Sequence, residues 1–253
     1  MAIIKGTRGH DILWGGPIEP AVIHGRGGHD EITGTIYDDT LFGDAGNDVL
    51  IGVAGNDRLF GGLGNDLLAD GEGWNEMRGG QGNDLIIGTG LLVGGFGDDW
   101  IDLRGGIAYG DVTPEFTSRR KGNDTFEIDM RHAAPETTYG AVGGRGADHY
   151  QVTFSADGVA SRLDVWDWSQ REGDSININL LPGLDSGQFG VLAGSLEVLL
   201  DTNGDHVIDG RDPASPLGVT WADPNANAVC FLVNGDMVAL WGTQSVAIGD
   251  WVL

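Results

Sequence analysis

The chain has 253 residues, of which 45 are glycine and 40% are hydrophobic, so it is neither collagen nor a disordered linker. Its formal net charge is −24, which repels nucleic acid and anionic membranes and favours cations as partners. The single cysteine, Cys230, excludes an internal disulfide and a thiol-rich metal site. We therefore expect a periodic, glycine-rich protein that binds cations.

The N-terminal segment MAIIKGTRGHD contains only a brief apolar run, too short for the core of a signal peptide. No later stretch approaches the roughly 20 apolar residues of a membrane span. We expect neither a cleaved N-terminal signal nor a membrane anchor.

A nine-residue repeat dominates the first part of the chain. Consecutive copies are GDAGNDVLI at 43–51, GVAGNDRLF at 52–60 and GGLGNDLLA at 61–69. The shared pattern is GGxGxDxUx, in which U is an apolar residue. Further copies in the same pattern are found at 6–14, 25–33, 70–78, 79–87 and 94–102.

This repeat resembles the RTX (repeats-in-toxin) family, whose hemolysin-type nonapeptides build a calcium-loaded parallel β-roll. The resemblance implies an all-β fold in which alternate repeats stack on the same side, several bound Ca²⁺ ions, and export by a type I secretion apparatus that reads an uncleaved C-terminal signal. The repeat aspartates expected to bind calcium are Asp11, Asp30, Asp39, Asp48, Asp57, Asp66, Asp84, Asp99, Asp124 and Asp148.

The residue types in the repeat suit this chemistry. Glycine allows tight turns with positive φ and lets backbone carbonyls approach an ion, while aspartate adds charge. Calcium takes 6 to 8 oxygen ligands, so two stacked turns have to share each ion. The middle residue of each short strand should point inward, at Leu13, Ile32, Leu41, Leu50, Leu59, Leu68, Met77, Ile86 and Ile101.

One apolar side chain per strand makes a thin core, so calcium has to supply much of the stability. A site with a dissociation constant near 1 mM contributes about 1.4 kcal/mol at ~10 mM calcium, and close to nothing at the calcium level of cytosol. We expect the chain to stay unfolded inside the cell and to fold outside it.

The two sides of the predicted roll differ. One series continues from Asp11 to Asp148, whereas the other offers Asp39 and Asp57, then Asn75, then the shortened segment GTGLLV at 88–93. We expect calcium on the second side to fade after about residue 75.

Glycine becomes rarer after residue 151. Segments such as RLDVWDW, SININL, AVCFLVN and MVALWG predict antiparallel β-structure. We expect the β-roll to span 1–151, and 152–253 to form a β-rich C-terminal cap that carries the secretion signal, because a roll needs its open end covered.

The segment DTNGDHVIDGRD at 201–212 resembles an EF-hand-type calcium loop. It departs from that pattern at His206, where glycine is usual, and at its last place, where aspartate replaces glutamate. The alternative is an acidic β-turn. The expected ligands are Asp201, Asn203, Asp205, Asp209 and Asp212.

We expect no active site. The chain has no HExxH or GxSxG motif, and Cys230 lies in an apolar, strand-like run. Trp14, Trp74 and Trp100 occupy variable repeat positions from which they could stack on sugars, although burial in the cap or core explains most tryptophans better.

The sequence therefore predicts a secreted, non-enzymatic calcium-binding protein. One alternative is the C-terminal folding and secretion module of a larger lipase, protease or alginate-epimerase-like exoprotein. Another is a calcium-dependent module that adheres to polysaccharide or to a surface layer.

Overall fold

The computed structural model describes residues 1–111, 122–130, 137–153, 162–166, 173–179, 207–209, 222–223, 228–233, 236–241 and 245–247. In this part of the chain there is no helix long and apolar enough to cross a membrane. The chain divides into two compact units, Met1–Glu127 with Gly143–Gly146, and Ile128–Val142 with Ala147–Leu253.

The first unit consists of strands that follow the nonapeptide frame. They are β1 (Ala2–Lys5), β2 (Ile12–Trp14), β3 (Ala21–His24), β4 (Glu31–Thr33), β5 (Thr40–Ala45), β6 (Val49–Ile51), β7 (Arg58–Leu63), β8 (Leu67–Gln81), β9 (Leu85–Phe96), β10 (Trp100–Asp111) and the start of β11 (Thr125–Asp129).

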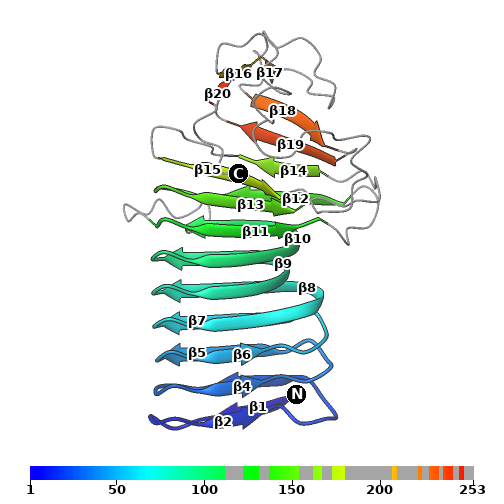
Figure 1. The fold of residues 1–253 in the computed structure, drawn as a ribbon. Helices are drawn as coiled ribbons and strands as arrows, with labels where there is room; N and C mark the ends of the chain where they lie inside the picture. Colours follow the sequence, from blue (N-terminus) through cyan, green and yellow to red (C-terminus); the bar gives the residue numbers. More distant parts are fainter. Residues whose placement is uncertain are drawn as a thin grey trace. The chain divides into compact units, whose positions relative to one another are not determined.

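Each early strand pairs in parallel with the strand two places further along the chain. Strand β1 pairs with β3, β2 with β4, β3 with β5 and β4 with β6. Strands β8, β9 and β10 each cover both sides of a coil, and β8 pairs with both β6 and β7. Figure 1 shows these coils stacked from β1 and β2 to β10. The predicted all-β fold with a parallel β-roll is confirmed.

Alternation along each strand places one residue in the core and its neighbours outside. In β6, Leu50 is fully buried, whereas Val49 and Ile51 are not. In the coil that contains β1 and β2, Leu13 is only partly covered. The other residues predicted to point inward are all buried, namely Ile32, Leu41, Leu50, Leu59, Leu68, Met77, Ile86 and Ile101.

The second unit mixes two kinds of strand pairing. Its strands are the end of β11, then β12 (Thr138–Val142), β13 (His149–Thr153), β14 (Arg162–Val165), β15 (Ser175–Asn179), β16 (Val207–Asp209), β17 (Ala222–Asp223), β18 (Ala228–Val233), β19 (Asp236–Trp241) and β20 (Ser245–Ala247). Strands β17, β18 and β19 pair in antiparallel order, as do β16 and β20.

The expected antiparallel pairing is wrong for β14 and β15. Strand β14 is parallel to β12 and β19, and β15 is parallel to β13. These strands keep the pairing of a coil, one coil apart, and bury Leu163 and Ile176 as the repeats bury their apolar residues. Coil-type pairing thus continues where the glycine-rich repeat is no longer visible in the sequence.

Candidate metal sites

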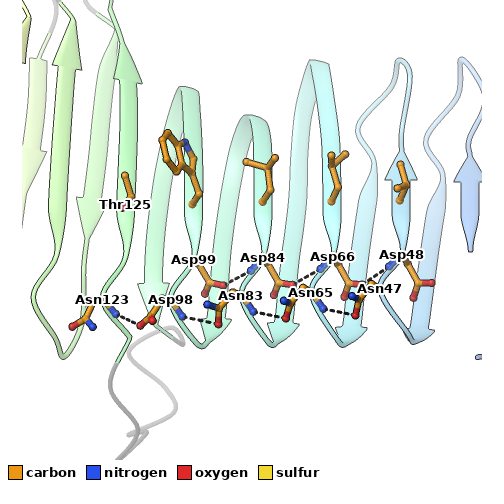
Figure 2. A pocket seen from close by; sticks show the side chains of 14 residues that line it. Asn47, Asp48, Asn65, Asp66, Asn83, Asp84, Asp98, Asp99, Asn123 and Thr125 are labelled. Carbon is orange, nitrogen blue, oxygen red and sulfur yellow. Dashed lines mark hydrogen bonds between the residues drawn. The ribbon is translucent and has the colours of Figure 1, made fainter. Parts of the chain in front are cut away.

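A row of repeat aspartates lies along one side of the first unit. The backbone N–H of each aspartate donates a hydrogen bond to Oδ1 of the aspartate in the next coil, with N to O distances of 2.7–2.9 Å. Figure 2 shows the central part of this row. We call it the long ladder, and it consists of Asp11, Asp30, Asp48, Asp66, Asp84, Asp99 and Asp124.

The sheet fixes the position of each carboxylate in the long ladder. Every aspartate stands directly before a strand. From Asp11 to Asp99, each carbonyl also accepts a hydrogen bond from the next coil, as when Leu67 N donates to Asp48 O at 2.8 Å. Main chain and side chain of Asp48 are therefore both tied to the coil that contains Asp66. These bonds confirm that alternate repeats stack on the same side of the roll, as the resemblance implied.

The second carboxylate oxygen of the central long-ladder residues has no hydrogen bond from the protein. Oδ2 of Asp30, Asp48, Asp66, Asp84 and Asp99 is buried without a hydrogen bond. Burial raises the pKa of Asp99 to about 8, of Asp66 to about 7 and of Asp84 to about 6. A buried charge needs a counterion or a proton, so this row favours cation binding.

Backbone oxygens converge on the same places. A Cβ atom added to Gly43 would lie 2.5 Å from Asp48 Oδ2 and 2.6 Å from the carbonyl oxygen of Gly61. Glycine is required there because any side chain would displace both oxygens. Within the described residues, no three His, Cys, Asp or Glu side chains come together, and the oxygen beside Asp48 Oδ2 belongs to the backbone of Gly61. An all-oxygen donor set of this kind fits calcium, which the long-ladder carboxylates and glycine carbonyls would hold.

A groove of about 580 Å³ runs beside the long ladder (Figure 2). Its polar side includes a row of asparagines next to the long ladder. Their backbone N–H groups donate to side-chain oxygens of the neighbouring coil, for example Asn65 N to Asn47 Oδ1 at 3.0 Å and Asn83 N to Asn65 Oδ1 at 2.9 Å. Its apolar side includes Leu85 and Trp100, and Trp100 is 47% exposed. Trp14 and Trp74 are also exposed, so these three tryptophans do not fill the core.

The other side of the roll carries a shorter row. Asp39 Oδ1 accepts from Ala21 N at 2.6 Å, Asp57 Oδ1 accepts from Asp39 N at 2.7 Å, and Asn75 Oδ1 accepts from Asp57 N at 2.8 Å. We call Asp39, Asp57 and Asn75 the short ladder. Asn75 is paired with Gly90 of β9, so the next coil places no side chain in line with it.

The remaining predicted ligands lie elsewhere. In the second unit, Asp148 N donates to Asp174 Oδ1 at 3.1 Å. Asp209 ends strand β16, whereas Asp201, Asn203, Asp205 and Asp212 are outside the described residues. The calcium roles of all these residues, and of both ladders, stay predictions.

Two buried aspartates that sequence reasoning missed adjoin the predicted ligands. Asp174 follows Gly173 and precedes β15, which is the end of a repeat without its first glycines. Asp70 stands at the first place of DGEGWNEMR, where the other copies have glycine. Asp70 could have been found as a departure from the glycine of the other copies, and Asp174 keeps only a glycine and an aspartate of the repeat.

Parallel coils whose turns bury carboxylates beside glycine carbonyls define a calcium-binding β-roll. Residues 3–17, 24–59 and 51–86 match the family model of the RTX calcium-binding nonapeptide repeat, in 4 copies. This part of the chain thus carries RTX calcium-binding nonapeptide repeats, as the sequence predicted. No curated protein matches the chain.

Proposed function

We propose that this chain is an exported, non-enzymatic calcium binder that stays unfolded in the cell and folds outside it. The observation that carries the proposal is the row of buried Oδ2 atoms without protein partners in the long ladder. Without calcium the folded roll has to bury these charges or protonate them, whereas the unfolded chain leaves them in water. Millimolar calcium outside the cell reverses this preference.

The size of the effect follows from mass action. A site with a dissociation constant near 1 mM contributes about 1.4 kcal/mol at ~10 mM calcium. A few such sites together approach the 5–15 kcal/mol that typically separates folded from unfolded domains. At sub-micromolar calcium the same sites contribute almost nothing.

Circular dichroism tests the proposal directly. We expect a disordered spectrum in excess chelator and a β-rich spectrum at ~10 mM calcium. Magnesium at the same concentration is the control, because it demands octahedral geometry and gives up water reluctantly, so it should not fold the chain. A β-rich spectrum in chelator at neutral pH that calcium leaves unchanged would contradict the proposal.

Export is proposed to depend on the C-terminal region. In this proposal 1–151 is the roll, and 152–253 is its β-rich cap and carries the signal for a type I secretion apparatus. A passenger fused to 152–253 should leave cells that express such an apparatus, and the same passenger fused to 1–151 should not. If the chain is instead the C-terminal module of a larger exoenzyme, the same region would export that enzyme.

A second candidate function is calcium-dependent binding of an extracellular polysaccharide. The groove beside the long ladder favours it, since Trp100 is exposed next to amide side chains that can bond to hydroxyl groups. A glycan array in calcium should give signals that Trp100→Ala removes. Trp14→Ala, at an exposed ring that does not line the groove, is the control.

A further inference from the structure

The short ladder ends at a repeat that departs from the pattern. Its turns begin at Gly34 and Gly52, but the next turn begins at Asp70. The other side of the roll keeps glycine at this place at Gly25, Gly43 and Gly61. A single coil of the short ladder therefore receives an additional carboxylate.

In these turns, the space beside the first glycine is lined by carboxylate or carbonyl oxygens, and we call this space the hollow of the turn. The Asp70 carboxylate points into the hollow of the preceding turn, beside Gly52. A Cβ atom added to Gly34 would lie 2.5 Å from the carbonyl oxygen of Gly52 and 2.7 Å from Asp39 Oδ2. A Cβ atom added to Gly52 would instead meet two carboxylates first, Oδ2 of Asp70 and, at 2.5 Å, Oδ2 of Asp57. The two aspartates thus direct their Oδ2 atoms to the same side of Gly52.

Both carboxylates are held in place by their other oxygen. Asp57 Oδ1 accepts from Asp39 N at 2.7 Å, and Asp70 Oδ1 accepts from Glu72 N at 3.3 Å. Asn75 ends the turn that starts at Asp70. Its Nδ2 donates to Glu72 O at 3.2 Å within this turn, and its Oδ1 accepts from Asp57 N of the preceding coil. The convergence of the Oδ2 atoms is therefore built into the backbone of this turn.

The converging oxygens have no protein partner other than each other. Asp57 is 1% exposed and Asp70 is 4% exposed, and neither Oδ2 has a hydrogen bond. Among the described ion pairs, none includes Asp57 or Asp70. Two buried carboxylates that meet without a cation repel each other, so the arrangement needs a positive ion or a shared proton.

We propose that Asp57 and Asp70 form a dicarboxylate calcium site that ends the short ladder and binds calcium more tightly than the hollows that combine one carboxylate with a glycine carbonyl. The inference rests on the proposed calcium-dependent folding of the roll. Ligand charge is a main determinant of calcium affinity, and a second carboxylate should tighten this site by tenfold or more. This site would fill first as the calcium concentration rises. It would fix the turn at 70–75, which lies within β8.

The test counts the ions that each variant retains. Wild type, Asp70→Gly and Asp70→Asn are dialysed against buffers of fixed free calcium from 1 μM to 10 mM, and bound calcium is measured by mass spectrometry. Asp70→Gly restores the residue of the other repeats, and Asp70→Asn keeps the shape but removes the charge. The control is Asp38→Asn, which removes an exposed charge from the same side of the roll and keeps the acceptor for Asn56 N.

We expect both Asp70 variants to lose one tightly held ion while still folding at 10 mM calcium, and the control to lose none. Asp57→Asn should lose the same ion, and the double variant with Asp70→Asn should lose no further tight ion, because both groups serve one site. Unchanged tight binding in folded Asp70 variants would overturn this inference and leave the proposed function standing. A wild-type chain that folds without binding any calcium would instead overturn the proposed function and this site with it.

Discussion

The long and short ladders are built from the same repeat but end differently. The long ladder continues from Asp84 to Asp99 over 15 residues and from Asp99 to Asp124 over 25 residues. The short ladder stops at Asn75, although the strands on its side continue into β9 and β10. The length of a coil therefore does not decide whether a ladder continues.

The turn residue decides it. The long ladder passes the shortened coil because Trp100 pairs with Leu85, which brings Asp99 into line with Asp84. On the other side, GTGLLV at 88–93 lies within β9 and contains no aspartate, and Gly90 lies opposite Asn75. A parallel sheet thus preserves register through insertions and deletions, whereas a ligand row needs an aspartate in every turn.

The largest expected effect comes from filling a hollow of the long ladder. Gly43→Ala would crowd Asp48 Oδ2 and Gly61 O, so it should lower the stability in calcium by roughly 3 kcal/mol, through overpacking and the loss of one ion. Gly71→Ala is the control, since a Cβ there meets nothing within 4 Å. Denaturant unfolding in calcium measures both. Equal effects of the two variants would show that the hollow is not a ligand site.

The second largest effect should come from removing one charge of the long ladder, and it should differ from the effect of a change in the short ladder. Asp66→Asn keeps an acceptor for Asp48 N but removes the charge that two neighbouring sites would share, which should cost about 2–3 kcal/mol in calcium. Asn75→Ala removes the acceptor for buried Asp57 N and should cost about 1 kcal/mol. Only the first penalty should depend on calcium concentration, so unfolding at 1 and 10 mM calcium distinguishes them. A calcium-dependent penalty for Asn75→Ala as large as that of Asp66→Asn would end the distinction between the ladders.

Acid should stabilise the calcium-free roll and should have little effect on the calcium-saturated roll. The pKa values of Asp66, Asp84 and Asp99 are raised to about 7, 6 and 8 in the folded state, above 3.8 for the unfolded chain. The calcium-free folded state therefore binds more protons, and it gains stability as the pH falls from about 8 toward 4.

Protons and calcium compete for the same carboxylates of the folded state, whereas the unfolded chain stays ionised from pH 8 to 6, so either ligand favours the fold. The calcium concentration at the folding midpoint should therefore fall as the pH falls from 8 to 6. Circular dichroism titrations at pH 8, 7 and 6 measure this shift. Asp99→Asn removes a group whose pKa is raised to about 8, so it should reduce the shift of the calcium midpoint with pH. A midpoint that stays constant over this range would mean that the ladder carboxylates are already ionised in the calcium-free fold.

The repeat frame predicted the roll, its inward residues and the two ladders because glycine, aspartate and the apolar residue recur at fixed places. Leu50 and Asp48, for example, follow from the frame alone. The frame could not predict that Asp70 turns into the hollow beside Asp57, because that depends on a turn between Asp70 and Asn75 where the strand register shifts.

The second unit was harder to predict for a physical reason. Strands β14 and β15 have the alternation of any half-buried strand, and alternation does not distinguish parallel from antiparallel partners. Asp174 retains only the aspartate and the preceding glycine of a repeat turn, so the signal that identifies the earlier coils is missing. Pairing in this part is decided by contacts between distant segments, such as β14 with β19.

The smallest expected effect concerns the loop at 201–212, which belongs to neither ladder. Its ligands, if it binds calcium, come from consecutive residues of one segment, so the site should form independently of the roll. Asp201→Ala combined with Asp205→Ala should remove about one bound ion and leave the calcium midpoint of the roll within twofold of wild type. Calorimetric stoichiometry and a circular dichroism titration of the same protein measure the two quantities. An unchanged ion count would make the loop an acidic turn, and a large shift of the midpoint would show that the ladders depend on it.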